Sequence, residues 1–415
     1  NAAESKRRAF TKQQQRALLV VVSAVALLLT FGIVTKENSS EVFNAPSSAS
    51  TDALLKKAVR ADKKGGAVEE EDFFCGFANH ETGYIKLPNK KDDHYFYWYV
   101  ESRSSPSKDP LNGPCHVQSD LSTKINPYSW NREANVIWLD QPTGVGYSYG
   151  DESDYDSGEL NVGENIYWFL QEFLKKHPEL ADREFFVTGE SYGGHYVPAA
   201  ASYIIKQNVH RHLHPEAVHI NLAGIAIGNG ITDPIVQYQY SVDMAFNSYN
   251  VTLLDDAQIE EMRAAQPTLE TPYFLAKRNP YDIRQACDEE DLMKCFHFEH
   301  IDAYLNSESV LMQLGVDTKH SKAWRECDGH VGSAFVYDQM RSFADDVKLA
   351  LHSGVRVLIY AGDADLMCNW VGNQAWTLAL DWSGKQQFND AESRVFVTSE
   401  VADAGRVRSF ENFAF

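Results

Sequence analysis

The sequence contains no internal repeat, no paired histidine or cysteine spacing of the zinc type and no glycine-rich nucleotide-binding motif. The first absence argues against a solenoid or propeller, because those folds stack similar units along the chain. The other two give no reason to expect a metal or a cofactor. Positive charge is also scarce, with 38 Lys and Arg against 58 Asp and Glu and a formal net charge of −20. Such a surface repels phosphates, so we expect no nucleic-acid partner.

An uncharged apolar run occupies residues 17–34 and is long enough, as a helix, to cross most of a bilayer. Five basic residues precede it and only Lys36 follows closely, so the positive-inside rule places residues 1–16 in the cytosol as a basic tail. We therefore predict a transmembrane signal-anchor that attaches the chain to a membrane. A cleaved signal peptide is the alternative, since small residues follow at 45–50. Either way, the rest of the chain enters the secretory route.

Two further features agree with that route, which leads to a vacuole-like or lysosome-like lumen or to the cell exterior. Sequons begin at Asn38 and Asn250, and they predict glycosylation at both positions. The chain has six cysteines, which can form disulfides in an oxidising lumen. Their pairing cannot be chosen from the residues alone.

The body of the chain follows a polar segment. Residues 35–71 are rich in Ser, Ala, Lys and Glu, and they predict a flexible stalk before a domain at 72–415. In that domain we expect strands at 94–101, 135–140, 184–189, 220–228, 355–362 and 394–399, and helices at 161–176 and 194–207. Strands alternating with helices predict an α/β class with a mostly parallel sheet. Residues 233–328 are charged and helical in pattern, and they predict a helical cap inserted into the sheet domain.

The strongest local motif is Gly-Glu-Ser-Tyr-Gly-Gly at residues 189–194, between an expected strand and an expected helix. This G-x-S-x-G pattern is typical of a nucleophile elbow, a tight turn that presents a serine hydroxyl at a helix N-terminus. Glycines flank the serine because side chains there would clash with the neighbouring strand and helix. An isolated match of this kind also occurs as an ordinary strand-to-helix turn, so the surrounding sequence has to decide.

The longer stretch GESYGGHYVPA at 189–199 closely resembles the nucleophile region of the serine carboxypeptidase family. Similar resemblance recurs at 99–109, 130–149, 228–230, 279–283 and 360–376, and together the matches span nearly all of residues 72–411. The resemblance implies an α/β-hydrolase fold with a helical cap. It also implies a serine-type hydrolase that removes C-terminal residues from peptides and proteins through an acyl-enzyme.

The same resemblance implies roles for individual residues. Ser191 would be the nucleophile, and the backbone N–H of Tyr192 would be one oxyanion donor. In the family's G-D-x-D-x-x-C-N pattern the second aspartate orients the catalytic histidine, so we expect Asp365, and not Asp363, to be the triad acid. Cys368 resembles the family's pocket cysteine, a free thiol near the substrate side chain.

Glu190 stands beside the expected nucleophile. A protonated carboxyl group there can donate a hydrogen bond to the C-terminal carboxylate of a peptide, whereas an ionised one would repel it. The resemblance gives Glu190 this substrate-binding role, which would favour activity at acidic pH. It also makes a disulfide between Cys287 and Cys295 plausible.

Two parts that the family uses are missing. No histidine follows Asp365, although family members carry the catalytic one in a later Gly-His-Met-Val-Pro segment. His195 lies one helical turn beyond Ser191, and we expect it to pack rather than to act as a base. Family members also have an apolar strand and a glycine-rich oxyanion loop that are absent between Leu111 and Asn112. That omission would leave the central sheet short of one strand.

These omissions leave three hypotheses open. The first is an active carboxypeptidase represented by an incomplete sequence, which a short cap between Pro267 and Tyr273 also favours. The second is a catalytically inactive, carboxypeptidase-like binding protein. The third is an acyltransferase, because the same triad can pass an acyl group to an alcohol or amine when water is excluded. Glu190 favours peptide C-termini over this last option.

Overall fold

The computed structural model describes residues 18–22, 80–102, 114–126, 128–132, 134–265, 277–287, 298–398 and 401–415. The predicted basic tail at 1–16, the stalk at 35–71 and positions 17 and 23–34 of the predicted signal-anchor lie outside these ranges.

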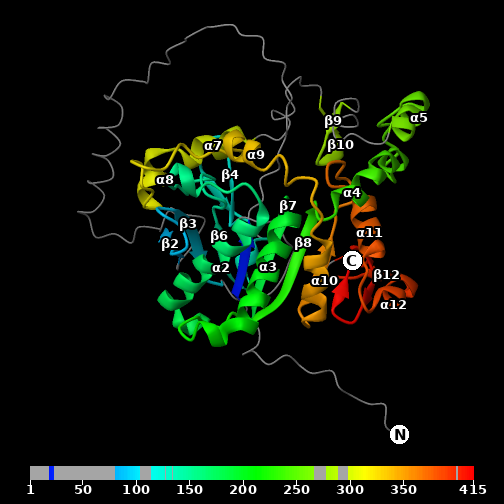
Figure 1. Cartoon of the computed structure of the whole chain (residues 1–415). Helices are drawn as coiled ribbons and strands as arrows, with labels where there is room; N and C mark the ends of the chain where they lie inside the picture. The colour runs from blue at the N-terminus through cyan, green and yellow to red at the C-terminus, as the bar shows by residue number, and fades with distance from the viewer. Residues whose placement is uncertain are drawn as a thin grey trace.

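A nine-stranded sheet forms the centre of the described structure, in the order β14-β15-β11-β8-β7-β1-β6-β3-β2 (Figure 1). Its strands are β1 (Leu18–Val22), β2 (His80–Lys86), β3 (His94–Val100), β6 (Asn135–Leu139), β7 (Phe185–Ser191), β8 (Leu222–Gly230), β11 (Arg356–Tyr360), β14 (Ser409–Phe410) and β15 (Phe413–Ala414). From β6 across to β15 all pairings are parallel, and antiparallel pairings occur towards the two edges. The mostly parallel sheet predicted from the alternating pattern is confirmed.

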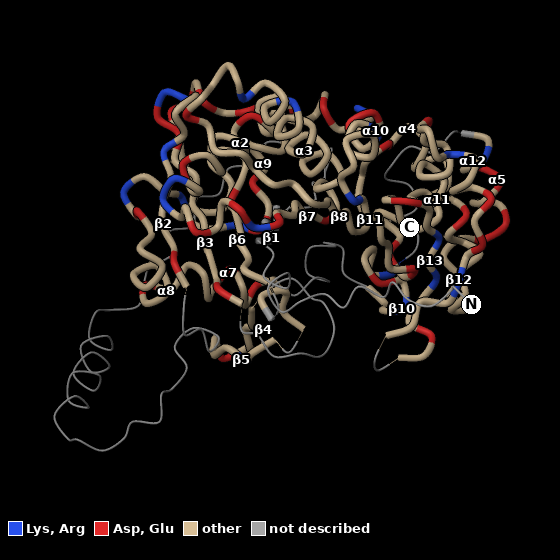
Figure 2. The backbone as a smooth tube through the Cα atoms, turned by 90° about the horizontal axis from the view of Figure 1, so that it is seen from below, with Lys and Arg blue, Asp and Glu red and all other residues tan. Residues whose placement is uncertain are grey.

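Two long helices, α2 (Glu159–Lys176) and α3 (Gly193–His210), pack on one face of this sheet together with the shorter α10 (Ala344–His352). Figure 2 shows them on one side of the strands, with α7 (Glu299–Leu305) and the hairpin of β4 (Cys115–Val117) and β5 (Thr123–Ile125) on the other. In α2 the apolar residues Val162, Ile166, Phe169 and Phe173 recur at helical spacing and are fully buried. The two helices predicted at 161–176 and 194–207 are therefore confirmed, each slightly longer than expected.

Shorter elements complete the described structure. They are η1 (Trp130–Arg132), η2 (Glu152–Asp154), η3 (Pro178–Leu180), η4 (Arg211–Leu213), α4 (Pro234–Gln237), η5 (Tyr238–Phe246), α5 (Asp256–Ala265), β9 (Arg278–Asn279), β10 (Asp282–Ala286), α8 (Glu308–Gln313), α9 (Gly329–Ala334), α11 (Trp370–Ala379), α12 (Lys385–Asp390), β12 (Arg394–Phe396) and β13 (Gly405–Val407).

The middle of the sheet departs from the sequence-based expectation. A membrane helix was predicted over 17–34, but Leu18–Val22 forms β1, which lies between β6 and β7. β1 thereby occupies a central position in the sheet, where the sequence analysis expected one strand to be missing. The physical reason is that buried ladder groups need partners, and an uncharged apolar run suits a central parallel strand. Among the described residues, no helix is long and apolar enough to cross a membrane.

A second correction concerns residues 394–399, which were expected to form a buried strand. Only β12 forms there, and it pairs with β13 in a separate antiparallel ribbon. Val395 and Phe396 are 48% and 51% exposed. A short apolar run fixes strand formation but does not fix which sheet the strand joins, and here β15 takes the place beside β11.

The predicted cap at 233–328 divides into two groups that Figure 1 shows on different parts of the sheet domain. The first contains α5 and the β9–β10 hairpin, and its apolar core includes Met244, Ile283 and Leu366. The second contains α7 and α8, and there Tyr304 and Phe96 belong to one buried cluster. The cap is therefore not purely helical, and its two halves rest on separate apolar clusters.

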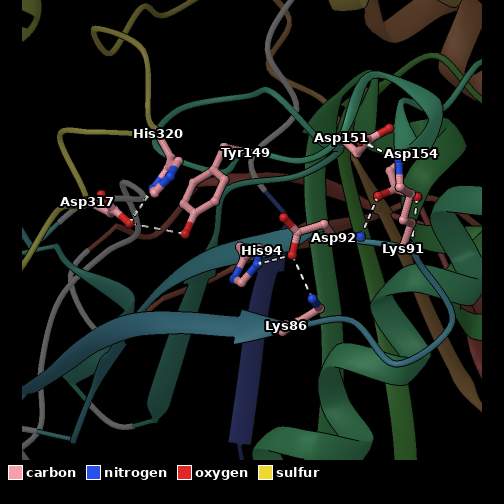
Figure 3. A network of polar contacts seen from close by, with 9 residues as sticks. All are labelled: Lys86, Lys91, Asp92, His94, Tyr149, Asp151, Asp154, Asp317 and His320. Atoms are coloured by element: carbon pink, nitrogen blue, oxygen red, sulfur yellow. Dashed lines mark hydrogen bonds and ion pairs between the residues drawn. The ribbon is translucent and has the colours of Figure 1, made fainter.

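A stack of aromatic rings joins the second cap group to the sheet edge (Figure 3). The ring of Tyr149 lies between His94, at 4.8 Å, and His320, at 5.3 Å. The Tyr149 hydroxyl donates to Asp317 at 3.3 Å, and His320 Nδ1 lies 2.8 Å from the same carboxylate. On the other side, His94 Nε2 lies 3.0 Å from Asp92. Polar as well as apolar contacts therefore hold this group in place.

Candidate active site

Ser191 occupies the joint between β7 and α3. Its φ is +57°, in the left-handed region that non-glycine residues rarely adopt. The N–H of Ile231 donates to the Ser191 carbonyl oxygen at 2.9 Å and holds the turn against the end of β8. A Cβ atom on Gly194 would lie 2.4 Å from the carbonyl oxygen of Ile231, so this position accepts only glycine. The strand, strained serine and helix are the local structure that a nucleophile elbow requires.

The thiol of Cys368 lies close to the serine. Cys368 Sγ is 3.9 Å from Ser191 Oγ, at the outer limit of a weak hydrogen bond. Cys368 is buried and its thiol is free, as predicted. Burial raises the pKa of this thiol well above its ordinary value, so the group stays neutral at physiological pH. A neutral thiol beside the serine can line a pocket without competing as a nucleophile.

Asp365 lies in the turn after β11, three residues before Cys368. Its Oδ1 accepts hydrogen bonds from the backbone N–H groups of Met367, at 2.7 Å, and Cys368, at 3.1 Å. Burial raises the pKa of Asp365 to about 7, and the charge of Glu190 acts in the same direction. Asp363, by contrast, is exposed and accepts a hydrogen bond from Tyr249. Of the two aspartates, buried Asp365 is therefore the one bonded to Cys368, whose thiol lies beside Ser191.

Asn229, at the end of β8, is a site residue that the sequence reasoning did not assign. Its side-chain amide donates to the carbonyl oxygens of Gly362 and Cys368, both at 3.3 Å. Its Oδ1 accepts from the N–H of Gly362 at 3.0 Å. Asn229 thus connects both ends of the turn that carries Asp365. The Gly-Asn-Gly sequence at 228–230 was the available signal, but nothing in it revealed this function.

His195 packs inside α3, as the sequence predicted. Its side chain is fully buried, its Nδ1 contacts the carbonyl oxygen of Ile231, and its ring stacks on Tyr192 at 4.4 Å. Burial lowers the pKa of His195, so the imidazole is neutral. In the part of the chain that the structure describes, no imidazole contacts Ser191 Oγ.

Comparison with known proteins identifies the family. A family model described as serine carboxypeptidase matches residues 73–111 and 112–415, two segments that adjoin where the sequence analysis located the missing strand and loop. A serine carboxypeptidase-like protein of Oryza sativa subsp. japonica is 33% identical over 407 residues, which cover 86% of this chain and 90% of that protein. Carboxypeptidase Y of Candida albicans is 35% identical over 384 residues, covering 80% and 68%. The chain belongs to the serine carboxypeptidase family.

A solved structure agrees on the fold of this serine carboxypeptidase. Kex1(Δ)p, a prohormone-processing carboxypeptidase from Saccharomyces cerevisiae, superimposes with a TM-score of 0.68 at 21% sequence identity. The match covers 81% of this chain and 85% of that one. The resemblance to the family and to its α/β-hydrolase fold, predicted from motifs, is therefore confirmed.

A buried hydrogen bond holds the side chain of Tyr192, the residue after Ser191. Tyr192 is buried, and its hydroxyl donates to Asp338 Oδ2 at 3.1 Å. The other oxygen of Asp338 lies 3.3 Å from Arg341 Nη1 and 3.4 Å from the backbone N of Glu159. No sequence motif pointed to Asp338, because its partners come from distant parts of the carboxypeptidase chain. The contact holds the Tyr192 side chain in one position beside the elbow.

Glu190 is exposed and lies at the carboxyl end of β7, next to Ser191. Its charge contributes to raising the pKa of both Asp365 and the Cys368 thiol, which shows that the three groups share one electrostatic environment. The structure therefore gathers Glu190, Ser191, Asp365 and Cys368 at the carboxyl ends of β7 and β11. Open α/β sheets bind ligands at this end of their strands.

The remaining predicted residues are only partly described. Cys287 is disulfide-bonded, but its predicted partner Cys295 lies outside the described residues. Cys115 is also disulfide-bonded. Asn250 is exposed, which is the arrangement a glycosylation acceptor needs, while Asn38 lies outside the described ranges.

Proposed function

We propose that this serine carboxypeptidase releases C-terminal residues through an acyl-enzyme formed on Ser191. The observation that carries the proposal is the strained serine, with φ of +57° at the junction of β7 and α3. Buried Asp365 and the Cys368 thiol lie around it. We assign to the exposed carboxyl group of Glu190, when protonated, the binding of the substrate's terminal carboxylate, and to Cys368 a place beside the substrate side chain.

The proposed chemistry has two steps. Ser191 Oγ attacks the scissile carbonyl, its proton passes to a base, and the terminal amino acid leaves with a proton as the ester forms; water then hydrolyses the ester. In this scheme Asp365 orients an imidazole base, and the backbone N–H of Tyr192 donates to the oxyanion. An adjacent imidazolium would favour the ionised form of Asp365, because opposite charges in a buried site stabilise each other.

The test compares the 415-residue chain with the product of the full native transcript, sequenced across residues 105–120 and past residue 415. The substrate is an N-blocked dipeptide at pH 4 to 7. If the transcript supplies a further histidine and the glycine-rich loop, we expect release of the terminal amino acid. Ser191→Ala should then reduce kcat by about 10⁴-fold or more, and Ser202→Ala, at a buried serine farther along α3, should leave it unchanged. Full activity of the Ser191→Ala variant would overturn the assignment.

A second candidate function is retention of peptide C-termini without cleavage. The observation that favours it is the surroundings of Ser191 Oγ, whose described side-chain neighbour is the Cys368 thiol and not an imidazole. Without a base, a serine hydroxyl is a poor nucleophile. The 415-residue chain would then not react with a serine-directed phosphonate, yet would bind a peptide with a free C-terminus more tightly than its amidated form. Labelling of Ser191 would exclude this candidate.

We also propose that the protein works in an oxidising lumen of the secretory route or outside the cell. The disulfide bonds at Cys115 and Cys287 support such a compartment, because cytosolic thiols are kept reduced. The exposed sequon at Asn250 agrees with it. Residues 17–34 have the composition of a segment that directs a chain into this route. Glycan release followed by mass measurement of the native protein tests the placement.

A further inference from the structure

The space between β6 and β7 is filled by a strand from the N-terminal end of the chain. β1 pairs in parallel with β6 from Leu18↔Asn135 to Val22↔Leu139. It also pairs in parallel with β7, from Leu18↔Phe185 to Val22↔Gly189. Figure 1 shows this strand in dark blue inside the sheet. Every residue of β1 thus has a partner on both sides.

β6 and β7 cannot pair with each other across this space. Neighbouring strands lie about 4.8 Å apart, so two strands separated by a third stand roughly 10 Å apart, far beyond hydrogen-bond reach. Both strands belong to the core, where Ile137 of β6 and Val187 of β7 are fully buried. Buried backbone groups without partners destabilise a fold strongly. The sheet therefore requires a strand at this position.

The chain between β3 and β6 does not supply that strand within its described residues. Its strands there, β4 and β5, pair with each other and lie outside the main sheet. The family match is interrupted in the same interval, between residues 111 and 112. The sequence of β1, Leu-Leu-Val-Val-Val, is uncharged and largely β-branched, as a strand buried on both faces should be.

We propose that the slot between β6 and β7 is a strand-acceptor site and that its ligand is Leu18–Val22 of the same chain. Main-chain hydrogen bonds supply the affinity, as in other cases of strand addition. Since Leu18–Val22 belongs to the apolar run at 17–34, pairing in the sheet and insertion into a bilayer compete for one segment. Folding of the domain withdraws the segment from the membrane. The proposal does not depend on catalysis by Ser191.

β1 also supports the turn at Ser191. Its last residue, Val22, pairs with Gly189, two residues before Ser191, and with Leu139, at the end of β6. An empty slot would leave β7 without a partner on one side just before the strained turn. Occupation of the slot is therefore a condition for the geometry of the elbow as well as for the stability of the sheet.

Amide hydrogen exchange on the full chain tests the pairing directly. We expect the amides of Leu18–Val22 to exchange at least about 100-fold more slowly than those of an unstructured peptide, because they open together with the core strands. The amides of β7 serve as the internal reference. Exchange of Leu18–Val22 at the rate of an unstructured peptide, in a chain whose β7 amides are protected, would overturn the proposal.

Val20→Pro and Val25→Pro are a matched pair of variants. Both place a proline in the apolar run, but only Val20 lies in β1. Val20 stands near the start of the run, where a proline disturbs a membrane helix less than in its interior. We expect Val20→Pro to lower the midpoint of thermal unfolding by about 5 °C or more, or to prevent folding, and Val25→Pro to shift it by less than about 2 °C. Equal midpoints for the two variants would contradict the proposal.

Flotation with phosphatidylcholine vesicles tests the competition itself. We expect the folded wild-type chain to remain unbound and the Val20→Pro chain, which cannot fill the slot, to float with the vesicles. A wild-type chain that floats while its β7 amides stay protected would show that the folded domain does not need Leu18–Val22, and the proposal would fail.

Discussion

Tyr192 shows how a single buried hydroxyl can support the turn that carries Ser191. Its ring stacks on His195 and its hydroxyl donates to Asp338 at 3.1 Å. Burial is the main cause that raises the pKa of Tyr192 far above its ordinary value, so the hydroxyl remains a donor at every accessible pH. A buried carboxylate that loses its donor keeps the full penalty of desolvation. The contact should therefore contribute measurably to stability.

Tyr192→Phe removes only this hydroxyl. We expect the variant to lower the free energy of unfolding by about 1–3 kcal/mol, because Asp338 Oδ2 then loses its buried donor. Tyr337→Phe is the matched control, since Tyr337 is 92% exposed and its hydroxyl lies in water; its effect should stay within about 0.5 kcal/mol. Urea unfolding followed by tryptophan fluorescence measures both. Equal effects would mean that the contact with Asp338 contributes nothing.

At the scale of elements, hydrogen bonds within the loop after β6, and one to β3, hold that loop in place. Half-buried Asp140 accepts a hydrogen bond from the Tyr147 N–H at 2.8 Å. Ser148 Oγ donates to the Asp140 carbonyl oxygen at 2.6 Å and accepts from the N–H of Phe96 in β3 at 2.7 Å. Gly146 has φ of +56°, and a Cβ there would lie 2.1 Å from Asp140 Oδ2.

Gly146→Ala and Gly315→Ala separate backbone strain from collision. Both glycines have positive φ, but a Cβ on Gly315 would meet nothing within 4 Å. We expect Gly315→Ala to destabilise the fold by about 1 kcal/mol through backbone conformation alone. Gly146→Ala should cost at least about 1 kcal/mol more, since Asp140 must move from its hydrogen bond. Urea unfolding of both variants gives the difference, and a Gly146→Ala variant no less stable than Gly315→Ala would refute this account of the loop.

At the scale of the whole molecule, buried carboxyl groups link stability to pH. Burial raises the pKa of Asp93, Asp140 and Asp365 each to about 7. In the unfolded chain such groups titrate near pH 4. Between these values the folded state binds more protons than the unfolded state. Stability is therefore highest at the acidic end of the window and falls as the pH rises from about 4 to about 7.

Other groups do not reverse this direction. His195 acts oppositely, because burial lowers its pKa and its unfolded form takes up a proton below about pH 6.5. It is a single group against these three carboxyl groups and Glu159, whose pKa burial also raises. Asp92 has its pKa lowered to about 2 by hydrogen bonds to Lys86 and His94, so it affects stability only at lower pH. The net charge of −20 adds self-repulsion as carboxyl groups ionise.

We accordingly expect the free energy of unfolding to decrease by roughly 2–5 kcal/mol between pH 4.5 and pH 7.5, measured by urea titration at several pH values. Asp140→Asn removes one of the titrating groups and should flatten the profile. A stability that rises with pH over this range would refute the assignment of these carboxyl groups as protonated in the fold. An acid-stable fold agrees with the vacuole-like or lysosome-like lumen expected from the sequence.

Some of this protein could be predicted from consecutive residues. The elbow around Ser191 and the helix that follows it follow from a short motif, because a tight turn places its demands on adjacent positions. The α/β class follows from alternating apolar patterns for a similar reason. In each case the physical constraint acts locally, so the local sequence carries it. The choice of Asp365 over Asp363 as triad acid came from the resemblance to the family and stays a prediction.

Contacts between distant residues were decided only by the tertiary structure. Asn229 and Gly362 are 133 positions apart, and Tyr192 and Asp338 are 146 apart, so no local pattern joins them. The apolar run at 17–34 shows most clearly what the sequence alone cannot decide. The apolar composition of this run requires that part of it be buried away from water. Insertion into a bilayer and pairing as a central strand of the sheet satisfy that requirement equally. The pairing of Leu18–Val22 with β6 and β7 decided between them, because only the assembled sheet presents unpaired backbone groups on both sides.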